Sequence, residues 1–195
     1  SLGMVPSLGM LGGMLDGRSG GQQGSLDEAE VLAMGVSDFT QHAQFETLPG
    51  VPIELEAINR TWPGANFLNE DFTKQSLIDQ RQQTPYGIVH LATHAEFKSG
   101  SIENSYIQLW DEKLLLSELS ELGWASPAVE LLVLSACNTA TGSPDAEMGF
   151  AGLAIASGVS SAMASLWSVN DLGTLALMNE FYRQLQGAPT KAQAL

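Results

Sequence analysis

The stretch Ile88-Val89-His90-Leu91-Ala92-Thr93 is a continuous, mostly apolar run that follows the chain-breaking tripeptide Pro85-Tyr86-Gly87. A run of this length predicts a strand that is buried on both faces. Residues 129–135 form a second run of the same kind, and weaker ones lie at 31–37, 65–69 and 161–168. Helical patterns separate these runs. The sequence therefore predicts a three-layer α/β/α domain with a mostly parallel sheet between the helices.

The expected helices have apolar residues at helical spacing or begin at a capping residue. They lie at residues 51–62, 71–83, 117–122, 149–157 and 171–185, and Asp71 is the expected N-cap of the second. Residues 106–110 and 113–116, joined by Asp111-Glu112, predict a small hairpin insertion. Residues 11–30 are rich in Gly, Gln and Ser. We therefore expect a flexible or linker-like segment over residues 1–30 and one domain over 31–195.

The composition argues against several classes of protein. Eight Lys and Arg stand against 22 Asp and Glu, a formal net charge of −14, so we expect no nucleic-acid partner. No apolar run reaches the roughly 20 residues of a membrane span, so we expect no membrane partner. The single cysteine excludes an internal disulfide and a multi-cysteine metal site. We expect no metal and no cofactor, and a cytoplasmic location, where a lone thiol stays reduced.

A histidine and the only cysteine each follow one of the two main predicted strands. His94 comes directly after the first strand and Cys137 just after the second. The carboxyl ends of neighbouring parallel strands meet at one edge of the sheet, where ligands bind in such folds. A thiol becomes a useful nucleophile when a nearby imidazole favours the thiolate, so the pair predicts a Cys–His dyad. The position of Cys137 after a strand fits a buried, inert cysteine equally well. His90 lies inside the strand and predicts a core role, whereas His42 lies in a polar loop.

Seven segments resemble the CHAT-domain family, which comprises caspase-like cysteine peptidases often fused to tetratricopeptide repeats. The two signature segments are His90-Leu91-Ala92-Thr93-His94 and Leu132-Val133-Leu134-Ser135-Ala136-Cys137-Asn138-Thr139-Ala140. The other similar segments are Pro52-Ile53-Glu54-Leu55, Phe67-Leu68-Asn69-Glu70, Glu147-Met148-Gly149-Phe150-Ala151-Gly152-Leu153-Ala154, Ala164-Ser165-Leu166-Trp167-Ser168-Val169-Asn170-Asp171 and Met178-Asn179-Glu180-Phe181-Tyr182. The resemblance covers residues 31–195, and the segments are most similar to those of cyanobacterial members.

The resemblance implies a caspase-like fold. It also implies that the protein hydrolyses peptide bonds and needs no cofactor. His94 would be the general base, and Cys137 would be the nucleophile that forms a thioester. Backbone N–H groups of Cys137 and Ala95 would hold the oxyanion. The family commonly has Gly where this chain has Ala95; if that position needs a positive φ, Ala costs about 1 kcal/mol of strain.

Three further residues are expected at the substrate. Asp171 should lie at the same sheet edge, where its carboxylate would bind a basic substrate side chain, as in several caspase relatives. The structural alternative is that Asp171 caps the helix that follows it. Trp167 would form a wall of the cleft or belong to the core. Asn138 stands where the family usually carries a charged residue, and we expect it to affect substrate contacts.

Two functions stay open at this point. The first is a cysteine endopeptidase whose partners are a protein or peptide substrate and, upstream in a longer parent protein, a repeat or recognition module. We expect the chain to be a core truncated at both ends, because the resemblance implies further strands on either side. The second is a catalytically weak or inactive scaffold that acts through protein–protein contacts. A small-molecule hydrolase is less well supported, since the sequence has no Gly-rich phosphate loop and no Gly-x-Ser-x-Gly elbow.

Overall fold

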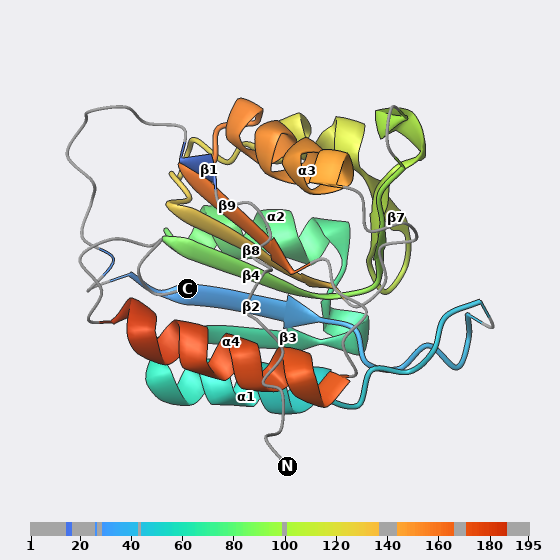
Figure 1. Cartoon of the computed structure of the whole chain (residues 1–195). Helices are drawn as coiled ribbons and strands as arrows, with labels where there is room; N and C mark the ends of the chain where they lie inside the picture. Colours follow the sequence, from blue (N-terminus) through green and yellow to red (C-terminus); the bar gives the residue numbers. More distant parts are fainter. Residues whose placement is uncertain are drawn as a thin grey trace, which may run out of the picture.

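The computed structural model describes residues 15–16, 26, 29–42, 44–98, 101–136, 144–165 and 171–186, without the side chains of 15–16, 144–149, 165 and 171–174. Six strands form the main sheet in the order β1-β9-β8-β4-β2-β3 (Figure 1). All neighbouring pairs from β9 to β3 are parallel, and β1 joins β9 antiparallel. The predicted mostly parallel sheet is confirmed. Its strands are β1 (Leu15–Asp16), β2 (Val31–Gly35), β3 (Gly64–Leu68), β4 (Ile88–Thr93), β8 (Leu131–Ala136) and β9 (Ser161–Ser165).

Helices cover both faces of this sheet, as the sequence predicts for a three-layer fold. On one face α1 (Val51–Thr61) and α4 (Asp171–Leu185) lie side by side (Figure 1). On the other face lie α2 (Lys74–Gln83), the 3₁₀ helix η4 (Leu116–Leu122) and α3 (Pro144–Ala156). None of the described helices is long and apolar enough to cross a membrane.

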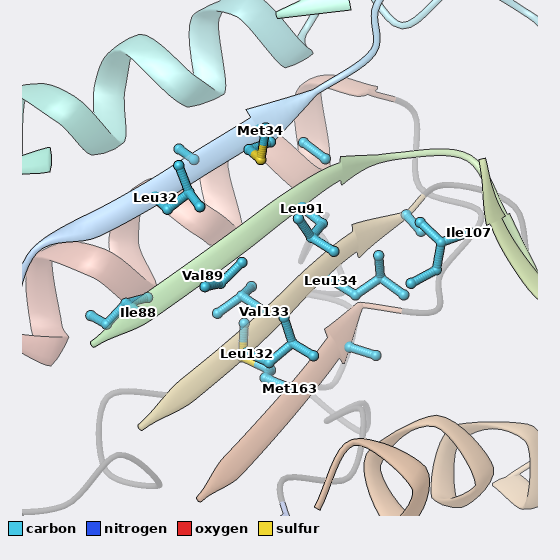
Figure 2. Packing of buried hydrophobic residues seen from close by; sticks show 14 of the residues in the cluster. Leu32, Met34, Ile88, Val89, Leu91, Ile107, Leu132, Val133, Leu134 and Met163 are labelled. Carbon is cyan, nitrogen blue, oxygen red and sulfur yellow. The ribbon is translucent and has the colours of Figure 1, made fainter. Parts of the chain in front are cut away.

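The core is centred on β4 and β8, whose residues are buried along the whole length of both strands. Figure 2 shows how apolar side chains of β2, β4, β8 and β9 stand side by side across the sheet. Leu91, Leu132 and Val133 have no exposed surface. Each such side chain contributes about 1.5–3 kcal/mol to folding relative to an exposed one, so these strands form the stable base of the molecule.

Two helix starts differ from the prediction. Helix α2 begins at Lys74 and its N-cap is Thr73, not Asp71; the Thr73 hydroxyl accepts from the Ser76 amide at 3.0 Å. Asp71 belongs instead to the 3₁₀ turn η2 (Asn69–Asp71) that closes β3. Helix α3 begins at Pro144, five residues before the predicted start. Proline is favoured in the first helical turn because the amide that it lacks would have no partner there.

A second, three-stranded antiparallel sheet lies off the carboxyl ends of the parallel strands (Figure 1). The predicted hairpin is confirmed as β6 (Tyr106–Gln108) and β7 (Lys113–Leu115). The third strand, β5 (Ala95–Glu96), pairs with β6 and is not predicted from the sequence. A two-residue strand is too short to show a periodic pattern, so its sequence carries no signal. The chain thus turns directly from β4 into this small sheet at His94.

A few residues of the predicted N-terminal linker are described. The strand β1 pairs with the edge strand β9, and Leu26 is buried. Most of residues 1–28 lie outside the described residues, so the flexible segment and its boundary at residue 30 stay predictions.

Three buried polar side chains tie α1 and α4 to β4. The Tyr182 hydroxyl lies 3.1 Å from Nδ1 of His90. On the other side of the ring, Glu54 Oε1 lies 3.1 Å from Nε2, within ion-pair distance but outside hydrogen-bond geometry. The Trp62 indole N–H adds a bond to the backbone oxygen of Tyr182 at 3.0 Å. His90 has no exposed surface, so its predicted core role is confirmed.

Removing the Tyr182 hydroxyl tests this network. Burial, and then the Glu54 charge, raise the pKa of Tyr182 well above 10. The folded protein therefore keeps the phenol protonated where the unfolded chain ionises it, and the free energy of unfolding falls as pH rises above about 10. Tyr182→Phe should lose about 1–3 kcal/mol at neutral pH, because it leaves His90 Nδ1 without a partner.

The same variant should show a shallower fall of stability at alkaline pH, since Tyr182 accounts for up to about 1.4 kcal/mol per pH unit of that fall. Urea unfolding at neutral pH and between about pH 9 and 11 measures both effects. Equal slopes for the two proteins would show that Tyr182 does not stay protonated in the folded state.

Candidate active site

His94 lies at the carboxyl edge of the main sheet, directly after β4. Strands β4 and β8 run parallel with Thr93 beside Ala136, the residue that precedes Cys137 in the chain. Neighbouring strands are about 4.8 Å apart, so the two segments that carry the predicted dyad leave the sheet at the same place. Cys137 itself lies outside the described residues.

Two phenylalanines from the loop between β2 and α1 pack against the imidazole of His94. The ring of Phe45 is stacked on it, with centroids 5.1 Å apart and planes 16° apart. The ring of Phe39 lies at 4.6 Å and is tilted by 58°. The two phenyl rings also contact each other at 5.5 Å. Because His94 is only 6% exposed, this packing restricts its imidazole to one orientation.

The two ring nitrogens of His94 have different surroundings. Nε2 lies 2.7 Å from the backbone oxygen of Glu46. A carbonyl oxygen only accepts, so this contact assigns the proton to Nε2. In the neutral ring Nδ1 then carries a free lone pair, and Nδ1 is buried with no hydrogen-bond partner among the described residues. The arrangement leaves one nitrogen able to take a proton.

The surroundings of His94 also favour its uncharged form. Burial lowers the pKa of His94 below its ordinary value of 6.5, against the smaller, opposing effects of the Glu46 carbonyl and carboxylate. Burial acts in this direction because an imidazolium ion loses more hydration than a neutral ring. At neutral pH the imidazole is therefore ready to act as a base.

Ala95 does not carry the strain expected if its position required glycine. Asn69 is the only non-glycine residue with a positive φ in the described part of the chain, so the φ of Ala95 is negative. The Gln108 amide donates to the His94 oxygen at 2.8 Å, which makes Ala95 and Ile107 the non-hydrogen-bonded pair of β5 and β6. In such a pair the Ala95 amide points away from β6. The alanine therefore gives no support to the inactive-scaffold alternative.

The small sheet also holds the end of β4 in place. The buried Thr93 hydroxyl donates to the backbone oxygen of Gln108 at 2.6 Å. The Gln108 side chain, itself buried, donates to the Leu109 oxygen at 2.7 Å. Because Thr93 and His94 both bond to Gln108 of β6, the backbone that carries the imidazole is held by two hydrogen bonds.

The other predicted site residues are only partly described. Asn138 and Trp167 lie outside the described residues, and Asp171 is the first residue of α4, without a described side chain. Both interpretations of Asp171, substrate contact and helix cap, therefore stay predictions. His42 lies in the loop after β2, with its ring 6.5 Å from that of Phe45.

Sequence reasoning missed the contacts that hold His94. Phe39 and Phe45 stand in a stretch that is otherwise polar, and two large apolar residues in such a loop are a usable signal of a packed loop. The Glu46 contact comes from the backbone, so the residue type at that position carries no signal. Among the described residues, no three His, Cys, Asp or Glu side chains gather as a set of metal ligands.

Comparison with known proteins identifies the family. A search of curated proteins finds no match. The CHAT domain, a family of caspase-like peptidases, matches residues 13–195, nearly the whole chain, in agreement with the resemblance in the segments around His94 and Cys137. The chain therefore belongs to the CHAT-domain family.

Proposed function

We propose that this chain is a cysteine endopeptidase in which Cys137 is the nucleophile and His94 is the general base. The observation that carries the proposal is the imidazole of His94. Its Nε2 is held on the Glu46 oxygen, while its buried Nδ1 has no partner in the described part of the chain. It lies at the end of the strand that is paired with the segment leading into Cys137.

The mechanism follows from these positions. Nδ1 of His94 takes the proton of the Cys137 thiol, and the sulfur attacks the carbonyl carbon of the scissile peptide. The carbonyl π electrons move to its oxygen, which accepts hydrogen bonds from the amides of Ala95 and Cys137. The C–N bond then breaks, and the amine leaves with the proton held on Nδ1. Water, deprotonated at Nδ1, attacks the thioester, releases the carboxylic acid and restores the thiol. No cofactor takes part.

In this proposal the substrate is a protein or peptide and the protein acts in the cytoplasm. Asp171 binds a basic side chain of the substrate, and Trp167 and Asn138 contact the residues around it. The support for Asp171 is its place at the start of α4, shortly after the carboxyl end of β9. A repeat or recognition module in the parent protein would bring the substrate to this edge.

Alkylation of Cys137 tests the dyad directly. Iodoacetamide should modify Cys137 rapidly at neutral pH, and His94→Ala should slow the reaction at least about tenfold because the thiol loses its base. Mass spectrometry of the modified peptide measures the rate. The dyad is refuted if Cys137 reacts no faster than a free thiol and the His94 variant reacts equally fast.

The pH dependence of the same reaction tests the state of His94. Burial lowers the pKa of His94, so the base becomes available at a pH below 6.5. The alkylation rate should therefore rise with pH and reach half of its plateau below 6.5, while His94→Ala should move the midpoint toward the roughly 8.5 of an unperturbed thiol. A wild-type midpoint near 8.5 would contradict the assigned role of His94.

Cleavage of a peptide library tests the role of Asp171. Asp171→Asn keeps a residue able to cap a helix and removes the charge, so helix stability should change little. If the carboxylate binds a basic side chain, cleavage after Arg or Lys should fall at least about tenfold while Cys137 alkylation stays at the wild-type rate. Unchanged preference in the variant would leave Asp171 with the capping role alone.

A further inference from the structure

Asn69 has an unusual backbone conformation in a position close to the candidate site. Its φ of 54° is the only positive value at a non-glycine residue in the described part of the chain. Asparagine tolerates this left-handed conformation better than other residues, although the conformation still costs free energy. Asn69 begins the turn η2 directly after β3, at the same carboxyl edge of the sheet as His94. The free-energy cost of this backbone conformation has to be offset by a favourable contact of Asn69.

The side chain of Asn69 supplies that contact. Its Oδ1 accepts from the Ser37 amide at 2.8 Å, the Asp38 amide at 3.1 Å and the Ser37 hydroxyl at 3.3 Å. A carboxamide oxygen has two lone pairs, so three donors use its full capacity. Strands β2 and β3 are paired with Gly35 beside Leu68, which sets Ser37 and Asp38 next to the turn that carries Asn69.

Ser37 and Asp38 begin the loop that holds His94. The Ser37 oxygen accepts from the Leu48 amide at 2.9 Å and closes this loop at its base. Between these two points the loop carries Phe39, Phe45 and the Glu46 carbonyl. All three contact the imidazole of His94.

We infer that Asn69 is a positioning residue for His94, acting through the loop formed by residues 37–48. The oxygen of Asn69 fixes the first two residues of the loop, and the loop fixes the imidazole by stacking and by the Glu46 hydrogen bond. Asn69 does not touch the reacting atoms. The inference goes beyond the proposed dyad: it assigns a residue, in the turn after the outer strand β3, that keeps the proton of His94 on Nε2 and so leaves Nδ1 without a proton.

Three variants distinguish the effect of the Asn69 side-chain oxygen from the effect of its backbone conformation. Asn69→Gly removes the oxygen and keeps the freedom to adopt a positive φ. Asn69→Asp keeps an acceptor at the same place and also tolerates the left-handed region. Asn66→Gly removes the same type of side chain from β3, where Asn66 donates to the Leu55 oxygen at 3.0 Å and makes no bond to the loop. Each variant is first shown to be folded by circular dichroism.

The primary readout is nuclear magnetic resonance of the His94 ring, assigned by comparison with His94→Ala. Nitrogen-15 shifts report the tautomer, and a pH titration reports the pKa. In Asn69→Gly the preference for the Nε2–H tautomer should be lost and the titration midpoint should move up toward about 6.5, as the ring becomes exposed to water. Asn69→Asp and Asn66→Gly should keep the wild-type tautomer.

Several results would overturn the inference. Asn69→Gly with the wild-type tautomer and midpoint would show that the loop does not need the oxygen. An equal change in Asn69→Asp would show that the acceptor is not what matters. An equal change in Asn66→Gly would trace the effect to general loosening of β3.

The inference concerns the proposed site, but its test does not depend on catalysis. If Cys137 alkylation is independent of His94 in the wild-type protein, the proposed function fails while the resonance data still decide the role of Asn69. If the dyad is real, Asn69→Gly should also slow Cys137 alkylation, by roughly three- to tenfold, a change equivalent to the loss of about one net hydrogen bond. Asn69→Asp should restore most of that rate.

Discussion

The pairing of β4 with β8 is the constraint on which the rest of the structure depends. It runs from Ile88 beside Leu131 to Thr93 beside Ala136. Both strands are buried on both faces, so their apolar residues alone specify the register only weakly. A one-residue slip would nevertheless turn His90 away from Glu54 and Tyr182 and leave buried polar groups unpaired. The buried histidine thus helps to set the register that the candidate site needs.

His90 lies within β4 and His94 directly follows it, and their different surroundings give the two histidines different roles. His90 has a close polar neighbour at each ring nitrogen, a hydroxyl on one side and a carboxylate on the other. His94, four residues later, has a partner at Nε2 alone in the described part of the chain. A ring with neighbours on both sides is held as structure, whereas a ring held at one nitrogen keeps the other available for a proton.

Much of the fold is predictable from the sequence because its strands are long, apolar and closed by chain-breaking residues. The strand of residues 88–93 and the helix of 171–185 are examples in which local pattern and final structure agree. Helix starts are less predictable: Asp71 and Thr73 are both good caps, and the structure uses Thr73, which forms a capping box with Ser76. The position of His94 is predictable from its place after a strand. Its environment is not, because the stacking of Phe45 and the Glu46 carbonyl arise from a loop that is distant in sequence.

The site also carries a cost that the surrounding structure has to offset. A buried nitrogen that has no hydrogen-bond partner, as Nδ1 of His94 has none among the described residues, costs about 1–3 kcal/mol, and the left-handed backbone of Asn69 costs about 1 kcal/mol more. The three hydrogen bonds on Asn69 contribute about 0.5–1.5 kcal/mol each, enough to offset the strain at that residue. Among the described residues no hydrogen bond offsets the burial of Nδ1, and the apolar core around β4 and β8 supplies free energy on the scale of that cost. A family member that lost its chemistry would gain stability by giving this nitrogen a partner, and within the described residues the chain has not done so.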